Sequence, residues 1–120
     1  MTNNPSAFSL DKTKRICKRK IFLSLQSKGK RSFGKFLVLV AKMNKNLPLG
    51  QFGITVSKTV GKAHERNKVK RRLRHIIRLN QHLLNNKQLV IMARPSSKDC
   101  SFTELSHDLF STYKRLVREI

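Results

Sequence analysis

The chain has 120 residues, which is enough for one domain with a small hydrophobic core but not for a second. Its 27 Lys and Arg residues against 6 Asp and Glu give a formal net charge of +21 at pH 7, which favours a polyanion as the partner. Between Lys12 and Lys98 the only acid is Glu65. The sequence therefore excludes the paired carboxylates of a protein-borne phosphodiesterase site and the oxygen cluster of a tightly held metal ion.

The cysteines and the hydropathy of the chain bear on its location. Cys17 and Cys100 have no ligand-like spacing, so they are interpreted as reduced, semi-buried residues rather than as a metal site. No apolar run approaches the ~18 residues of a membrane span, and the N-terminus lacks the apolar core of a signal peptide. We therefore expect a cytoplasmic protein with no membrane contact and no metal site of its own.

The first part of the chain predicts an arm, a helix and a strand. Residues 1–9 carry no charged side chain and have little to bury, so they are predicted to form a flexible arm ahead of a single domain at 10–120. Apolar residues at helical spacing predict a short helix at about 18–27. Residues 35–41 form a short run that is apolar and rich in β-branched side chains, which predicts a central strand.

Two more strands are predicted further along the chain. Residues 44–50 are typical of a turn, and along 51–57 apolar residues alternate with small or polar ones, as in a half-buried strand. We expect this strand to pair back on 35–41 as a hairpin. Another buried strand is predicted at 88–93, where Arg94-Pro95 closes it.

A strongly basic stretch, 58–74, lies before the last of these strands. Eight of its seventeen residues are Lys or Arg, and the apolar residues from its second half onward follow the spacing of an amphipathic helix. These apolar residues are Val69, Leu73, Ile76 and Ile77. The residues that gather on the opposite side are Asn67, Lys68, Arg71, Arg74 and Arg78, with Lys70 and Arg72 on the flanks. Arg66 falls near the apolar edge, so either the helix begins after it or its stem packs on the core while its guanidinium reaches out.

The end of the chain predicts a structural helix. Ser101 and Glu104 have the spacing of a capping box, which opens a helix. The apolar stripe that follows consists of Phe102, Leu105, Leu109, Tyr113, Leu116, Val117 and Ile120. Since this segment holds four of the six acids when Asp99 is included, we expect it to support the fold and not to bind the polyanion.

The spacing Lys58-x-x-Gly61-x-Ala63-x-x-Arg66-Asn67-x-x-Lys70-Arg71-x-x-Arg74, after the strand-like 52–57, resembles the signature of the bacterial ribonuclease P protein subunit. The resemblance extends over roughly 15–117. It implies an α+β fold, a small single-domain sandwich of order αβββαβα like domain 2 of ribosomal protein S5, with a left-handed βαβ crossover. The residues alone predict two of the three early strands; the third is expected either near 31–33 or from a split of 35–41.

The resemblance also implies a function. Such a protein is the accessory subunit of a ribonucleoprotein endonuclease that removes 5′ leaders from precursor tRNA, with the chemistry in the RNA and the Mg²⁺ ions mainly RNA-held. It implies a monomer in a 1:1 complex with the RNA. The positions it assigns to RNA binding are Lys58, Gly61, Ala63, Arg66, Asn67, Lys70, Arg71 and Arg74, to which their basic neighbours Lys62, Lys68 and Arg78 are added.

A second surface implied by the resemblance is a cleft for the single-stranded leader, between the first helix and the sheet. Phe22 and Phe36 are its candidate stacking residues and Lys18 and Arg19 its candidate flanking cations, although a place in the core is an equal alternative for both phenylalanines. Where the family often has another aromatic residue, this chain has Gln26.

Two other functions remain as alternatives. A basic ribosomal or other structural RNA-binding protein would share the charge but would not need the spacing of 58–74. A self-sufficient nuclease would need general acid and base groups, and the four histidines show no paired spacing that supports one.

Overall fold

The computed structural model describes residues 28–118 and 120, so the predicted arm at 1–9 and the predicted helix at 18–27 lie outside the described residues. The strands are β1 (Lys30–Phe33), β2 (Leu37–Met43), β3 (Gln51–Val56) and β4 (Lys87–Ala93). The α-helices are α2 (Ala63–Leu79) and α3 (Phe102–Val117). Three short 3-10 helices are η2 (Lys58–Val60), η3 (Gln81–Leu84) and η4 (Pro95–Asp99). None of the helices in this part of the chain is long and apolar enough to cross a membrane.

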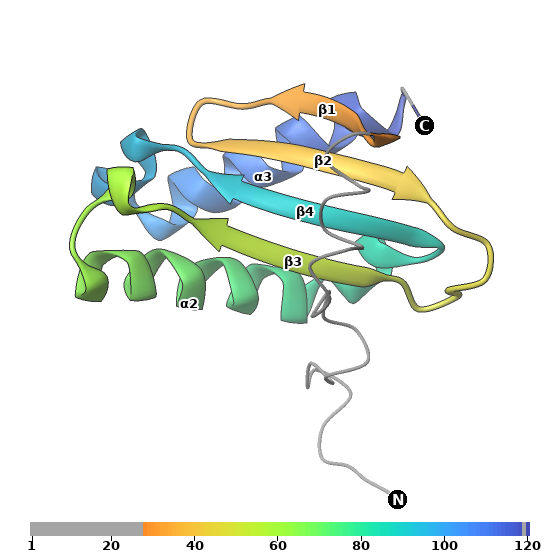
Figure 1. The fold of residues 1–120 in the computed structure, drawn as a ribbon, viewed down its shortest axis with the longest axis horizontal. Coiled ribbons are helices and arrows are strands. Elements are labelled where there is room, and N and C mark those ends of the chain that lie inside the picture. Colours follow the sequence, from red (N-terminus) through yellow and green to blue (C-terminus); the bar gives the residue numbers. More distant parts are fainter. Residues whose placement is uncertain (1–27, 119) are drawn as a thin grey trace, which may run out of the picture.

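The four strands form one sheet in the order β1-β2-β4-β3 (Figure 1). β2 pairs antiparallel with both β1 and β4, whereas β3 pairs parallel with β4. The predicted hairpin between β2 and β3 is therefore wrong, because β4 lies between them. The reason is burial: Leu89, Val90 and Ile91 are fully buried, so β4 needs a neighbour on each side, while the alternating β3 suits an edge.

The third early strand is β1, at the first of the two places expected for it. The turn to β2 is closed by the Gly34 amide, which donates to the Leu37 carbonyl at 2.7 Å. Beyond it, the Asp108 carboxylate of α3 accepts the amides of Lys35 at 2.9 Å and Phe36 at 2.8 Å. This contact joins parts of the chain that are more than seventy residues apart, and it fixes the β1–β2 turn on α3.

Both long helices cover the same face of the sheet. Leu73 and Ile77 of α2, Leu109 of α3, and Leu39 and Ile91 of the strands belong to one buried cluster. Figure 1 shows α3 behind the sheet and α2 beneath β3, with β3 and β4 running in the same direction. The connection from β3 through α2 to β4 therefore joins two parallel neighbouring strands through a helix, which is the kind of βαβ unit that the resemblance implied.

α3 begins with the predicted capping box, in which the Glu104 amide donates to the Ser101 hydroxyl at 3.1 Å and the Ser101 amide to the Glu104 carboxylate at 3.0 Å. The middle of the predicted stripe is buried, but its ends are not: Phe102 is 38% exposed and Val117 41%. Both lie at the ends of the helix. Thr112 is fully buried instead.

Candidate nucleic-acid interface

The loop between β3 and α2 is held by its backbone. The 3-10 turn η2 places Val60 in the core at 2% exposure, and the Gly61 amide donates to the Lys58 carbonyl at 3.2 Å. Gly61 has φ 154° and ψ −160°, a conformation that side-chain-bearing residues rarely adopt. Lys58 and Lys62 are both exposed on this loop, so their ammonium groups face solvent.

α2 begins at Ala63 with Lys62 as its N-cap. A lysine side chain has no acceptor, so only one half of a capping box is possible: the Glu65 carboxylate accepts the Lys62 amide at 2.9 Å. Glu65 also pairs with Lys98 of η4, with 3.3 Å between Oε2 and Nζ. The hydrogen bond from the Lys62 amide lowers the pKa of Glu65 below its ordinary value of 4.5, and the Lys98 ammonium lowers it further by a smaller amount.

The apolar stripe of α2 is buried as predicted. Val69 and Ile76 are 2% exposed, and Leu73 and Ile77 are fully buried. Since this face is fixed against the sheet, the rotation of the helix about its axis is fixed as well. The side chains on the opposite side must therefore point to solvent.

The opposite side of α2 is cationic. Asn67, Lys68, Arg71, Arg74 and Arg78 are all exposed, and Lys70 is half-buried. We define the basic face as the exposed cations of this helix and its preceding loop: Lys58, Lys62, Lys68, Arg71, Arg74 and Arg78. Among the described residues, Arg71 and Arg74 have no hydrogen-bond or ion-pair partner, so their guanidinium groups are available to a ligand. The Nη2 atom of Arg78 lies 2.6 Å from Nδ1 of His75.

Arg66 and Arg72 lie closer to the core. Because α2 begins at Ala63, Arg66 is within the helix, so the first of its two alternatives is excluded, and its side chain is half-buried. Its Nε is the one fully enclosed side-chain nitrogen or oxygen in the described part of the chain without a hydrogen-bond partner. Arg72 donates from Nη1 to the carbonyl of Cys100 at 2.9 Å, so it ties α2 to the start of α3.

Most of the predicted leader cleft is not described, because Phe22, Lys18, Arg19 and Gln26 lie outside the described residues. Phe36 is 8% exposed and belongs to the core cluster, which is the alternative left open for it. Only a small part of its ring is exposed, which leaves little surface for a base to stack on. Phe36 is accordingly assigned to the core and not to the cleft.

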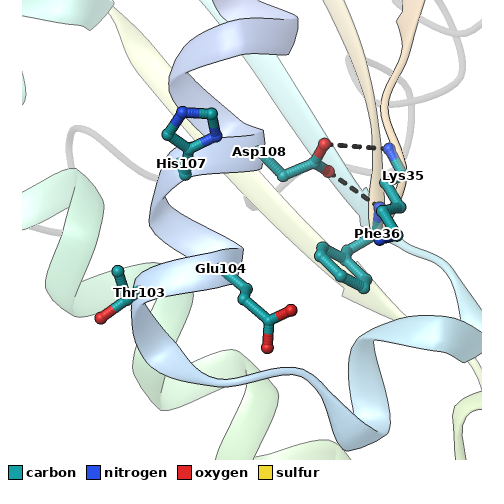
Figure 2. Close-up of a pocket in the computed structure, with 6 residues that line it drawn as sticks. All are labelled: Lys35, Phe36, Thr103, Glu104, His107 and Asp108. Atoms are coloured by element: carbon teal, nitrogen blue, oxygen red, sulfur yellow. Dashed lines mark hydrogen bonds between the residues drawn. The ribbon is translucent and has the colours of Figure 1, made fainter.

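Figure 2 shows the surroundings of Phe36, a pocket of about 360 Å³ between the β1–β2 turn and α3. The lining residues are Lys35, Phe36, Thr103, Glu104, His107 and Asp108. The Asp108 carboxylate points to the turn, and the Lys35 ammonium lies 5.4 Å from the centre of the Phe36 ring. With two carboxylates in its wall, this pocket disfavours a phosphate and is not part of the basic face.

Sequence reasoning missed two residues of functional interest. Phe33 is 62% exposed and lies opposite Val38 in the β1–β2 pairing. Val38 stands between the core residues Leu37 and Leu39 on β2, so its side chain points to the opposite face of the sheet from theirs. Phe33 therefore lies on the face of the sheet away from α2 and α3. The other is Glu65. It is a lone acid in a basic run and stands three residues after the N-cap, and this position could have indicated a capping role from the sequence.

No group of three or more His, Cys, Asp or Glu side chains in the described ranges, 28–118 and 120, could hold a metal ion. Burial raises the pKa of the Cys100 thiol, and its Sγ donates to the Ser97 carbonyl at 3.2 Å. A thiol with a raised pKa is a poor nucleophile and a poor metal ligand at neutral pH. The part of the chain that can be described therefore offers a cationic surface and no protein-borne metal centre.

Comparisons with known proteins show which sequences and structures this chain is similar to. The family model for Ribonuclease P matches residues 10–119. The Ribonuclease P protein component of Syntrophus aciditrophicus is 34% identical over 102 residues, covering 84% of this chain and 85% of that protein. That of Desulforapulum autotrophicum is 34% identical over 113 residues, covering 93% and 96%. The solved RNase P protein of Staphylococcus aureus superposes with a TM-score of 0.79 at 29% identity, covering 84% of this chain and 93% of that one.

Proposed function

The chain belongs to the ribonuclease P protein family, and on that premise we propose that its basic face binds the catalytic RNA of the ribonuclease P ribonucleoprotein. The RNA carries out the endonucleolytic removal of the 5′ leader from precursor tRNA, and this chain assists it. One observation supports this proposal above the others. The cations of α2 lie opposite its buried stripe, so they form one surface, as binding to a folded polyanion requires.

The side chains of the basic face suit a phosphate backbone. The planar forks of Arg71 and Arg74 can each engage two phosphate oxygens, whereas Lys58, Lys62 and Lys68 act as mobile point charges. Asn67 can donate to a sugar or phosphate oxygen. These contacts position RNA without reading its sequence, so the family's specificity for its RNA subunit must depend on the shape of the surface as well.

The precursor tRNA is proposed as the second partner. Its single-stranded leader would contact Phe22, Lys18 and Arg19, together with Phe33 on the face of the sheet away from the long helices. Stacking of a base on an exposed aromatic ring contributes about 1–3 kcal/mol by alanine substitution. Phe33 is therefore a better candidate than the buried Phe36 for such a contact.

The divalent ions of the reaction are proposed to be held by the RNA. Mg²⁺ prefers carboxylate and phosphate oxygens, and the basic face has only Glu65 among its cations, already paired with Lys98. The cations of the protein would instead screen the repulsion between catalytic RNA and substrate, so that less Mg²⁺ is needed. We further propose a cytoplasmic protein that acts as a monomer in a 1:1 complex with the RNA.

Reconstitution tests this function. The chain is added to a bacterial ribonuclease P RNA at low Mg²⁺, and 5′ maturation of a precursor tRNA is followed on a gel. We expect cleavage at the mature 5′ end only when both RNA and protein are present, and tighter binding of the precursor than of mature tRNA. A structural RNA-binding protein would give no stimulation and no preference for the leader. Cleavage by the purified protein alone would instead identify a self-sufficient nuclease.

A further inference from the structure

We propose that Glu65 is a positioning residue for RNA binding: a carboxylate beside the basic face that raises the affinity for ribonuclease P RNA by fixing the loop 58–62. The inference rests on the proposed function, because it concerns how the same surface is held. The charge of Glu65 alone would predict the opposite effect on RNA affinity. A negative group beside phosphates repels them, so charge alone predicts that removing Glu65 strengthens binding.

Glu65, in the first turn of α2, has two polar partners. One carboxylate oxygen accepts the Lys62 amide at 2.9 Å, and the other lies 3.3 Å from the Lys98 ammonium of η4. η4 in turn packs against η2, the turn that carries Lys58. A single side chain therefore links the first turn of the helix, its N-cap and the segment that supports the loop.

Gly61 completes the arrangement. A Cβ at Gly61 would lie 2.7 Å from Oε1 of Glu65, closer than Cβ atoms approach other atoms. Its φ of 154° also favours glycine, so the loop passes the carboxylate with backbone alone. The absence of a side chain at Gly61 is what lets Glu65 reach the Lys62 amide.

The consequence is a preformed position for two cations. Lys58 and Lys62 are exposed, so their side chains are not held by packing, and their placement depends on the backbone of the loop. If Glu65 is removed, the Lys62 amide loses its acceptor and the loop loses its tie to η4. Ordering the loop would then occur during binding, and the entropy lost would reduce the affinity for a partner of defined shape.

The chain offers a matched control in Glu104. Both glutamates stand three residues after an N-cap, accept its amide and carry one negative charge, but Glu104 lies on α3 and lines the pocket against the β1–β2 turn instead of holding the loop 58–62. Glu65→Ala and Glu104→Ala therefore make the same change in charge and in capping. We would measure the dissociation constants of each variant for ribonuclease P RNA and for poly(U), a single strand without defined shape, at the same salt concentration.

We expect Glu65→Ala to bind ribonuclease P RNA about five-fold more weakly, the size expected for one lost N-cap bond, and poly(U) as tightly as the wild type or more so. Glu104→Ala should bind both RNAs no more weakly than the wild type. Glu65→Gln keeps the acceptor for the Lys62 amide but not the charge, so it should restore most of the specific affinity. It also provides a second reading if Glu65→Ala does not fold.

Each outcome decides the proposal. If Glu65→Ala, or Glu65→Gln where the alanine variant is unfolded, binds ribonuclease P RNA more tightly than the wild type, charge dominates and the inference is overturned. Equal weakening by Glu104→Ala also overturns it, because the effect would then be one of overall stability. A wild-type protein that prefers neither RNA overturns the proposed function itself, and that result is distinguishable because it appears before any substitution is made.

Discussion

Removing two cations from the basic face should reduce the salt dependence of RNA binding by a predictable amount. Six exposed cations form this face, and each phosphate contact contributes about −0.7 to −0.9 to the slope of log affinity against log salt. The wild-type slope should thus be about −4 to −5 and that of Arg71→Ala/Arg74→Ala about −3 to −4. Between about 50 and about 200 mM salt, the affinity should fall about a thousand-fold for the wild type and about a hundred-fold for the double variant.

The assay is the fluorescence anisotropy of labelled ribonuclease P RNA, titrated at several salt concentrations. Lys114→Ala/Arg118→Ala is the matched control, because it also removes two exposed cations but from the end of α3. Its slope should stay close to that of the wild type. Equal slopes for the two double variants would mean that net charge, rather than a defined surface, determines binding, and the reasoning about α2 would be refuted.

Three predictions concern the fold that supports this surface. Leu73→Ala removes a fully buried side chain of α2 and should lower the free energy of unfolding by about 2–5 kcal/mol in urea titrations, whereas a loss below about 1 kcal/mol would contradict its place in the core. Gly34→Ala places a Cβ 2.3 Å from Oγ1 of Thr112 and should cost about 1–3 kcal/mol; an unchanged melting temperature would count against the tight β1–β2 turn. Glu65 and Glu104 have lowered pKa values in the folded protein, so the stability they contribute is present above pH 4.5 and is lost as the pH falls through these lower pKa values. When both are replaced by Gln, the melting temperature should depend less on pH in the acid range, and an unchanged dependence would contradict this assignment.

The amphipathic helix could be predicted from the sequence because its signal is local. Val69, Leu73, Ile76 and Ile77 repeat at helical spacing, and burial of this stripe determines where the neighbouring cations point. The capping box of α3 could be predicted from the sequence for the same reason. Each of these features involves residues within a few turns of one another.

The order of the strands could not be predicted in this way. Alternation along β3 indicates that one face is buried, but it does not say which strand lies beside it, and the insertion of β4 between β2 and β3 depends on contacts distant in sequence. The same holds for Asp108, whose two hydrogen bonds to the β1–β2 turn span more than seventy residues. The burial of Phe36 and the exposure of Phe33 depend on how that turn is held, so the sequence alone could not predict which of the two rings is exposed.

The most direct test of the central claim is lysine footprinting on the wild-type chain. The protein is labelled with an amine-reactive reagent, alone and in complex with ribonuclease P RNA, and the modified residues are quantified by mass spectrometry. Lys58, Lys62 and Lys68 are exposed and should be strongly protected by the RNA, whereas the equally exposed Lys45 and Lys114 should react as they do in the free protein. Protection of Lys45 and Lys114 with continued labelling of the other three would contradict the claim that RNA binds along α2.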